Sequence, residues 1–268
     1  MTALPRRLLS LAVTSFVAMT VLSSGLAAPV ETATAASYPS SYERLWGDNC
    51  LAWERVLTPK TTCVYGDRTS KVVVAVVGDS HISHLFPAIE RIAIARHWKL
   101  VVMVKVSCGF VDMRIRNLHL GREYYECATW NRNVVARLNV LKPTLTLVAQ
   151  SRYAIHQVLS SQSSNTAKGQ AEGRLLKKVP GQVALIVDSP RRGQSSVGAM
   201  GAIEKVAGVY SGDSVINLTP DTCSRWPCPS SAGGITKFRD TEHFNAAWSR
   251  AMLGRPGGIL DRAMDARL

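Results

Sequence analysis

The chain has 268 residues, of which 46% are hydrophobic and 19% are charged, and its formal net charge is +13 at pH 7. This length is enough for one sizeable globular domain. The basic residues are scattered, in no run longer than a pair such as Lys177-Lys178. This excludes the long basic tracts typical of nucleic-acid binding, so we expect no nucleic-acid partner. The positive charge instead indicates an anionic surrounding, such as a membrane surface or an acidic envelope polymer.

The N-terminus has the layout of a secretory signal peptide. Arg6-Arg7 precede an uncharged apolar stretch, residues 8–28, and small-residue sites follow at 26–28 and 33–35. Because the apolar stretch is long, an uncleaved signal anchor is the alternative. Either way we expect an extracytoplasmic protein, secreted or membrane-anchored. We therefore divide the chain into a signal peptide or signal anchor over residues 1–36, a linker over 37–49 and a single domain over 50–268.

Six cysteines follow the signal segment, and an even count in an exported chain predicts disulfides. Six cysteines allow many connectivities, of which the simplest joins sequence neighbours: Cys50–Cys63, Cys108–Cys127 and Cys223–Cys228. There is no Cys-x-x-Cys pair, and no second ligand pair matches His81 and His84, so we expect no metal and no cofactor.

Apolar segments rich in β-branched residues alternate with segments of helical spacing. Strands are predicted over residues 72–77, 100–106, 143–149, 182–187 and 214–218, and helices over 83–97, 124–141, 197–209 and 240–253. Residues 160–173 are predicted as a surface excursion or as the start of a further helix. This alternation predicts an α/β fold, a three-layer sandwich around a mostly parallel sheet of about five strands.

The first predicted strand ends in chemistry-bearing residues. Six apolar residues lead directly into Gly78-Asp79-Ser80, and a predicted helix follows. Ligands of open α/β sheets bind at the carboxyl ends of the strands, which is where Ser80 falls. We interpret Ser80 as a nucleophile. The alternative is an ordinary turn, because glycine, aspartate and serine all suit a bend or a helix N-cap.

A serine nucleophile needs a base and a group that orients the base. Among the six histidines, His243 stands out because Asp240 precedes it by three positions at the start of a predicted helix. Positions three apart there lie on one face, so Asp240 can act as N-cap and hold one ring nitrogen of His243. The other nitrogen is then left for Ser80. The alternative is that Asp240 is only an N-cap and His243 a surface residue.

Taken together, Gly78-Asp-Ser-His81 and Asp240-Thr-Glu-His243 resemble the SGNH (GDSL-like) hydrolase superfamily. The resemblance is greatest to the extracytoplasmic SGNH domains fused to acyltransferase-3 type membrane O-acyltransferases. It runs from about residue 50 to residue 253 and implies the flavodoxin-like fold of that superfamily. Further matching elements are Cys63-Val-Tyr-Gly-Asp67, Ser107-Cys-Gly-Phe110, Cys127-Ala-Thr-Trp130, and the pair Cys223 and Cys228 before the Arg-Asp-x-x-His block.

The resemblance implies that Ser80 is the nucleophile, His243 the general base and Asp240 its orienting acid. It also implies an oxyanion hole that includes the Ser80 N–H. The superfamily usually adds a glycine N–H after the second strand, which falls here in Ser107-Cys108-Gly109. Its third donor is an asparagine after the third strand, where this chain has Gln150-Ser-Arg-Tyr153. Ser151 or Arg152, or else Gln150, is the replacement that we predict.

The activity implied is that of an exported serine acyl esterase or O-acyltransferase. It would act on short acyl esters, O-acetyl above all, of cell-envelope glycans through an acyl-enzyme. The partners implied are an acylated glycan or lipoglycan and a separate membrane acyltransferase, with contact to a membrane surface. One alternative is a lipid or thioester hydrolase on the same fold. The other is a non-catalytic envelope-binding module. The absence of the superfamily's Gly-x-Asn turn after the third strand favours this alternative.

Overall fold

The computed structural model describes residues 41–152, 154, 157–159 and 163–268. The predicted signal peptide or signal anchor, residues 1–36, lies outside the described residues. Among the helices that the described residues form, none combines the length and the hydrophobicity needed to cross a membrane.

A mostly parallel sheet forms the centre of the domain, and the predicted three-layer α/β fold is confirmed. All five predicted strands are present and pair in parallel in the order β4-β3-β7-β8-β9. Two short strands that we did not predict both pair with β4 and extend the sheet to seven strands. The bounds are β1 Leu51–Ala52, β2 Val64–Gly66, β3 Val73–Gly78, β4 Lys99–Lys105, β7 Leu145–Ala149, β8 Gln182–Ile186 and β9 Ser214–Ile216.

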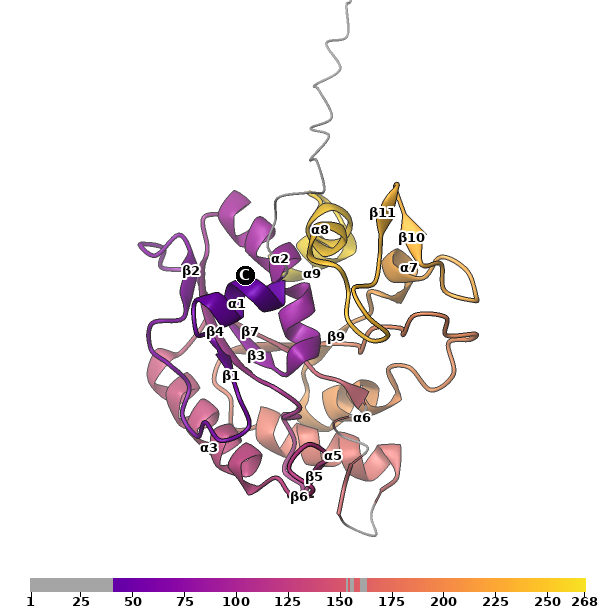
Figure 1. The fold of residues 1–268 in the computed structure, drawn as a ribbon. Helices are drawn as coiled ribbons and strands as arrows, with labels where there is room; N and C mark the ends of the chain where they lie inside the picture. The colour runs from indigo at the N-terminus through magenta and orange to yellow at the C-terminus, as the bar shows by residue number, and fades with distance from the viewer. Residues whose placement is uncertain (1–40, 153, 155–156, 160–162) are drawn as a thin grey trace, which may run out of the picture. The chain divides into compact units, whose positions relative to one another are not determined.

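Helices cover both faces of this sheet (Figure 1). Val74 and Val76 of β3 belong to one apolar core, whereas Ala75 and Val77 belong to the other. A strand buried on both faces needs apolar residues at every position, which explains the unbroken run that leads to Ser80. The first core is packed by α2 Ser80–Ala95, the π-helix η1 Ser249–Leu253 and α9 Ile259–Asp265, and the second by α3 Tyr125–Leu141, α5 Asn165–Leu176 and α6 Ala202–Ser211.

The predicted linker over residues 37–49 is wrong in part, because helix α1, Ser41–Gly47, lies inside it. Leu45 of α1 is fully buried in the first core. Arg44 Nη1 also donates a hydrogen bond of 2.8 Å to Glu90 Oε2 on α2. These contacts fix α1 on the domain, which therefore begins several residues before Cys50.

The predicted last helix, residues 240–253, is also wrong in its first turn. Residues 240–245 form a turn, and helix α8, Ala246–Trp248, begins only after Asn245, whose side-chain oxygen accepts a hydrogen bond from the Ala247 N–H. The chain then continues as η1, and α9 follows it without having been predicted. Short elements complete the fold: β5 Arg116–Asn117, β6 Arg122–Glu123, α7 Thr219–Thr222, β10 Ser231–Ala232 and β11 Ile235–Thr236.

Two of the three predicted disulfides are present, Cys50–Cys63 and Cys108–Cys127. The predicted bond Cys223–Cys228 is not formed in this structure, where both residues are buried free thiols. Each thiol donates a hydrogen bond to a nearby backbone carbonyl oxygen. Cys223 Sγ lies 3.1 Å from the Arg225 oxygen, and Cys228 Sγ lies 3.6 Å from the Thr222 oxygen.

Gly78 is the residue that allows β3 to pass directly into the turn before Ser80. Its φ is +144°, in a region that favours glycine, and a Cβ atom there would lie 1.8 Å from the carbonyl oxygen of Ala149 on β7. Only glycine therefore lets the two strand ends approach this closely.

We predict that Gly78→Ala lowers the free energy of unfolding by roughly 2–5 kcal/mol, because it adds both backbone strain and a steric clash. Urea unfolding followed by circular dichroism measures this loss. Gly47→Ala is the matched control, because no atom lies within 4 Å of its added Cβ. Equal unfolding midpoints for Gly78→Ala and the wild type would contradict the prediction.

Candidate active site

The buried carboxylate of Asp79 fixes the backbone on either side of Ser80. Its Oδ1 accepts a hydrogen bond of 2.8 Å from the His81 N–H, which caps the first turn of α2. Both of its oxygens also accept from the Ser151 N–H, at 3.1 and 3.0 Å, beyond the end of β7. Burial raises the pKa of Asp79 to about 6, against the opposing effects of the His81 charge and these N–H groups.

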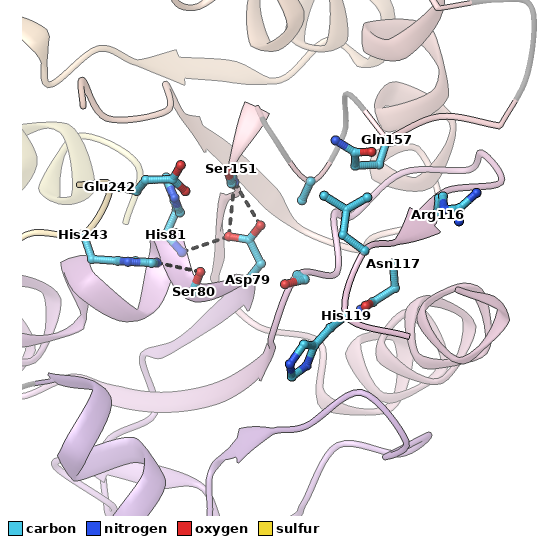
Figure 2. Close-up of a pocket in the computed structure, with 13 residues that line it drawn as sticks. Asp79, Ser80, His81, Arg116, Asn117, His119, Ser151, Gln157, Glu242 and His243 are labelled. Atoms are coloured by element: carbon cyan, nitrogen blue, oxygen red, sulfur yellow. Dashed lines mark hydrogen bonds between the residues drawn. The ribbon is translucent and has the colours of Figure 1, made fainter. Parts of the chain in front are cut away.

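Ser80, His243 and Asp240 form a continuous chain of hydrogen bonds. His243 Nε2 lies 2.9 Å from Ser80 Oγ across 163 positions of sequence, as Figure 2 shows. His243 Nδ1 lies 3.0 Å from each carboxylate oxygen of Asp240. The structure thus brings together the three residues that we predicted as nucleophile, base and orienting acid.

A short turn presents His243 to Ser80. Asp240 Oδ1 accepts hydrogen bonds of 2.8 Å from the N–H groups of both Glu242 and His243. Asp240 therefore caps a local turn, not the helix that we predicted, and it still holds the imidazole of His243 as expected. The next residue, Phe244, is buried against the rings of His84 and Trp248 and anchors the turn to the first core.

The surroundings of these three residues keep His243 neutral and Asp240 ionised. Burial and the nearby His81 lower the pKa of His243 below its ordinary value, although Asp240 acts in the opposite direction. Burial alone would raise the pKa of Asp240, but the N–H groups of Glu242 and His243 hold it well below its usual range. A neutral imidazole held by an ionised carboxylate can accept the proton of a serine hydroxyl.

A cavity of about 440 Å³ opens at Ser80 (Figure 2). Of the thirteen described residues that line it, only Leu118 and Ala154 have hydrophobic side chains. Sequence reasoning missed the polar residues Arg116, Asn117, His119 and Gln157, because they come from short segments that show no periodicity and no motif. His81 and Glu242 lie within the two quoted motifs, but no role was predicted for them.

The main-chain N–H groups after the third strand are already occupied. The Ser151 N–H binds Asp79, and the Arg152 N–H donates a hydrogen bond of 2.9 Å to Asp188 Oδ2. These two main-chain donors satisfy buried carboxylates, so an oxyanion role for Ser151 or Arg152 would fall to their side chains and stays a prediction. The side chain of Gln150 is occupied as well, since it accepts from the Phe110 N–H and donates 2.6 Å to Glu172 Oε1.

The four other residues predicted for the oxyanion hole remain compatible with that role. The Ser80 N–H lies in the first turn of α2, where an N–H group has no partner within the helix. Ser107, with a φ of +51°, lines the same cavity directly after β4. Cys108 and Gly109 follow it and are fixed in place, by the disulfide to Cys127 and by a hydrogen bond from Asn131 Nδ2 to the Gly109 oxygen.

A second histidine–carboxylate pair lies beside the first. His81 Nδ1 is 2.6 Å from Asp188 Oδ1, and both side chains are buried. His84, one turn further along α2, places Nε2 at 3.1 Å from Ser189 Oγ. Across the described ranges, no group of three histidine, cysteine, aspartate or glutamate residues is arranged to hold a metal ion.

Comparison with known proteins identifies the class to which this fold and site belong. Residues 49–179 match the family model described as the SGNH domain (fused to AT3 domains). The matched range includes Ser80 and ends before Asp240. The predicted resemblance is thereby confirmed over residues 49–179, and the match supports an enzyme of ester chemistry, an SGNH-type hydrolase or acyltransferase. A search of curated protein sequences found no significant match.

One solved structure shares the fold, and a second was found at a lower TM-score. The periplasmic domain of a lipopolysaccharide acetyltransferase from Salmonella ser. Paratyphi A is 14% identical, with 82% of this chain and 95% of that chain covered and a TM-score of 0.54. The C-terminal catalytic domain of peptidoglycan O-acetyltransferase A from Streptococcus pneumoniae is 11% identical, with coverages of 74% and 93% and a TM-score of 0.38. At 14% identity, the similarity to the Salmonella domain is a similarity of fold alone.

We predict that Asp240→Asn lowers kcat for ester hydrolysis by roughly 10³–10⁴-fold. The asparagine oxygen can still accept the backbone N–H groups of the turn, but the amide can no longer hold the His243 ring as the carboxylate does. Hydrolysis of p-nitrophenyl acetate measures the loss. Asp265→Asn removes a carboxylate that pairs with Arg96 on the far side of α2 and serves as the control. A loss of less than tenfold in Asp240→Asn would contradict the assigned role.

Proposed function

We propose that this protein is an exported serine esterase or O-acyltransferase that acts on short acyl esters, chiefly O-acetyl, of cell-envelope glycans. The observation that carries the proposal is the hydrogen-bonded chain Ser80–His243–Asp240 at the mouth of a polar cavity. A nucleophile, a base and a group that orients the base are the minimum set for acyl transfer.

The reaction proceeds in two halves. Ser80 Oγ attacks the acyl carbonyl carbon while His243 Nε2 takes the hydroxyl proton and Asp240 holds the ring at Nδ1. The ester C–O bond then breaks, His243 returns the proton to the departing alcohol, and the acyl group stays on Ser80. In the second half, water or a sugar hydroxyl attacks the acyl-enzyme with His243 again as base. Water gives a carboxylic acid, whereas a sugar gives a new ester, and Ser80 recovers its proton in both cases.

The lining of the cavity supports a short acyl group and a polar acceptor. Sites for long apolar ligands are lined mainly by hydrophobic and aromatic side chains. Here Asn117, His119, Gln157 and Glu242 lie around the cavity, and Leu118 and Ala154 are its only hydrophobic residues among those described. Such side chains can exchange hydrogen bonds with the hydroxyl groups of a sugar.

The family supports a membrane-associated source of acyl groups. Its description places the domain beside AT3 domains, and the Salmonella structure is a periplasmic domain. We therefore propose an extracytoplasmic location, a separate membrane acyltransferase as partner and an anionic glycan or lipoglycan as acceptor. The net charge of +13 favours such a surrounding.

A panel of p-nitrophenyl esters tests the activity and its acyl preference together. We predict that kcat/KM for the acetyl ester exceeds that for the octanoyl ester by about tenfold or more, because Leu118 and Ala154 are the only hydrophobic side chains that the described lining offers to a long chain. Ser80→Ala should abolish hydrolysis of every ester while its thermal unfolding matches that of the wild type.

Two results would contradict the proposal in different ways. A preference for the octanoyl ester would identify a lipid or thioester hydrolase on this fold. The absence of Ser80-dependent hydrolysis with every ester would favour a non-catalytic envelope-binding module.

A further inference from the structure

His81 follows Ser80 directly, yet its ring points away from the serine and toward the end of β8. There its Nδ1 lies 2.6 Å from Asp188 Oδ1, and each of the two side chains is only 4% exposed. Asp188 is itself held by hydrogen bonds from the N–H and the Nε of Arg152. The pair is therefore a rigid buried unit in which Nδ1 donates and the carboxylate accepts.

The other ring nitrogen of His81, Nε2, takes no part in the pair with Asp188. Nε2 is buried and has no hydrogen-bond partner among the described residues, and His81 is one of the residues that line the cavity. The centroid of its ring is 5.1 Å from that of His243. At this distance a charge on one ring acts strongly on the protonation of the other.

Several charged groups surround the two rings. His81 is influenced by the carboxylates of Asp188, Asp79 and Glu242, and Glu242 is itself paired with Arg191. His243 is influenced by Asp240, which favours its protonated form, and by His81 and Arg239, which oppose it. Three carboxylates therefore favour a cation at His81, whereas His243 has one carboxylate and neighbours of positive charge.

The three histidine rings consequently differ in charge. Burial opposes a charge on His81, but Asp188 prevails and raises its pKa to about 9. Burial, together with the charge on His81, holds the pKa of His84 well below its ordinary value. Near neutral pH, His81 is therefore the charged member of the cluster, and His84 and His243 are neutral.

We propose that the buried His81–Asp188 pair is a positioning element that keeps a fixed positive charge beside His243 and so maintains this base in its neutral, proton-accepting form under mildly acidic conditions. The inference rests on the proposed function, in which His243 is the base for Ser80. Asp240 alone would stabilise the protonated imidazole, and protonated His243 cannot activate the serine. The charge on His81 offsets that effect, so the site remains active at a lower pH.

The distance between the two rings sets the expected effect of the His81 charge on the pKa of His243. Two unit charges about 5 Å apart in a partly buried site shift a pKa by roughly 1 to 2. Removing the charge on His81 should therefore raise the pKa of His243 by this amount. Relative to the rate at pH 8, where His243 is neutral in either case, activity at acidic pH would then fall by roughly 10- to 100-fold.

Nuclear magnetic resonance of protein labelled with ¹⁵N-histidine tests the charge states without relying on activity. In the wild type, both ring nitrogens of His81 should stay protonated up to pH 8, while His243 titrates below its ordinary value. His81→Gln should raise the pKa of His243 by roughly 1 to 2. The control His97→Asn removes an exposed histidine just beyond the opposite end of α2 and should leave His243 unchanged. Assignment of the His243 signals comes from His243→Gln.

The pH profile of kcat/KM for p-nitrophenyl acetate provides the second readout. In His81→Gln the acidic limb should move to higher pH relative to the variant's own rate at pH 8, whereas a purely structural defect would lower the rate at every pH without moving that limb. An unmoved acidic limb, or a neutral His81 in the wild type at pH 7, overturns the inference. The wild-type titration decides this even if His81→Gln does not fold. Absence of hydrolysis by the wild type would instead count against the proposed function, and the titration would still test the charge on His81.

Discussion

The buried carboxylate of Asp79 is the contact on which the geometry of the site depends. It accepts N–H groups from the first turn of α2 and from the chain beyond β7, so it joins two neighbouring strand ends around Ser80. Its raised pKa means that ionising Asp79 opposes folding. That cost is absent below its unfolded pKa and complete above about pH 6. The domain thus gives up some stability in order to hold Ser80 in one orientation.

Two histidine–aspartate pairs share this framework and differ in protonation. Asp240 lies on an exposed turn and holds His243 at the cavity, whereas Asp188 lies at the end of a buried strand and holds His81 behind it. The partly exposed pair can exchange a proton with Ser80, and the buried pair has a fixed charge. The site therefore combines a base that exchanges protons, His243, with a neighbouring group of constant charge, His81.

The five main strands and the pairing of Asp240 with His243 could be predicted from the sequence, because they depend on local pattern. The family resemblance linked Ser80 to His243, 163 positions away. The Val-rich run before Ser80 shows burial on both faces, and the spacing of Asp240 and His243 brings their side chains together in a turn as well as in a helix. The roles of Ser151 and Arg152 could not be predicted, since they depend on which buried carboxylates lie across the strand ends. The His81–Asp188 pair likewise joins residues 107 positions apart, and no local pattern links them.

In the proposed reaction, Ser80 carries the acyl group between donor and acceptor. Rapid acid quenching of the protein with p-nitrophenyl acetate, followed by peptide mass spectrometry, tests this role. We predict one acetyl group on the peptide that contains Ser80, formed faster in the wild type than in His243→Gln and absent from Ser80→Ala. Acetylation confined to other residues, or p-nitrophenol release that persists in Ser80→Ala, would contradict it.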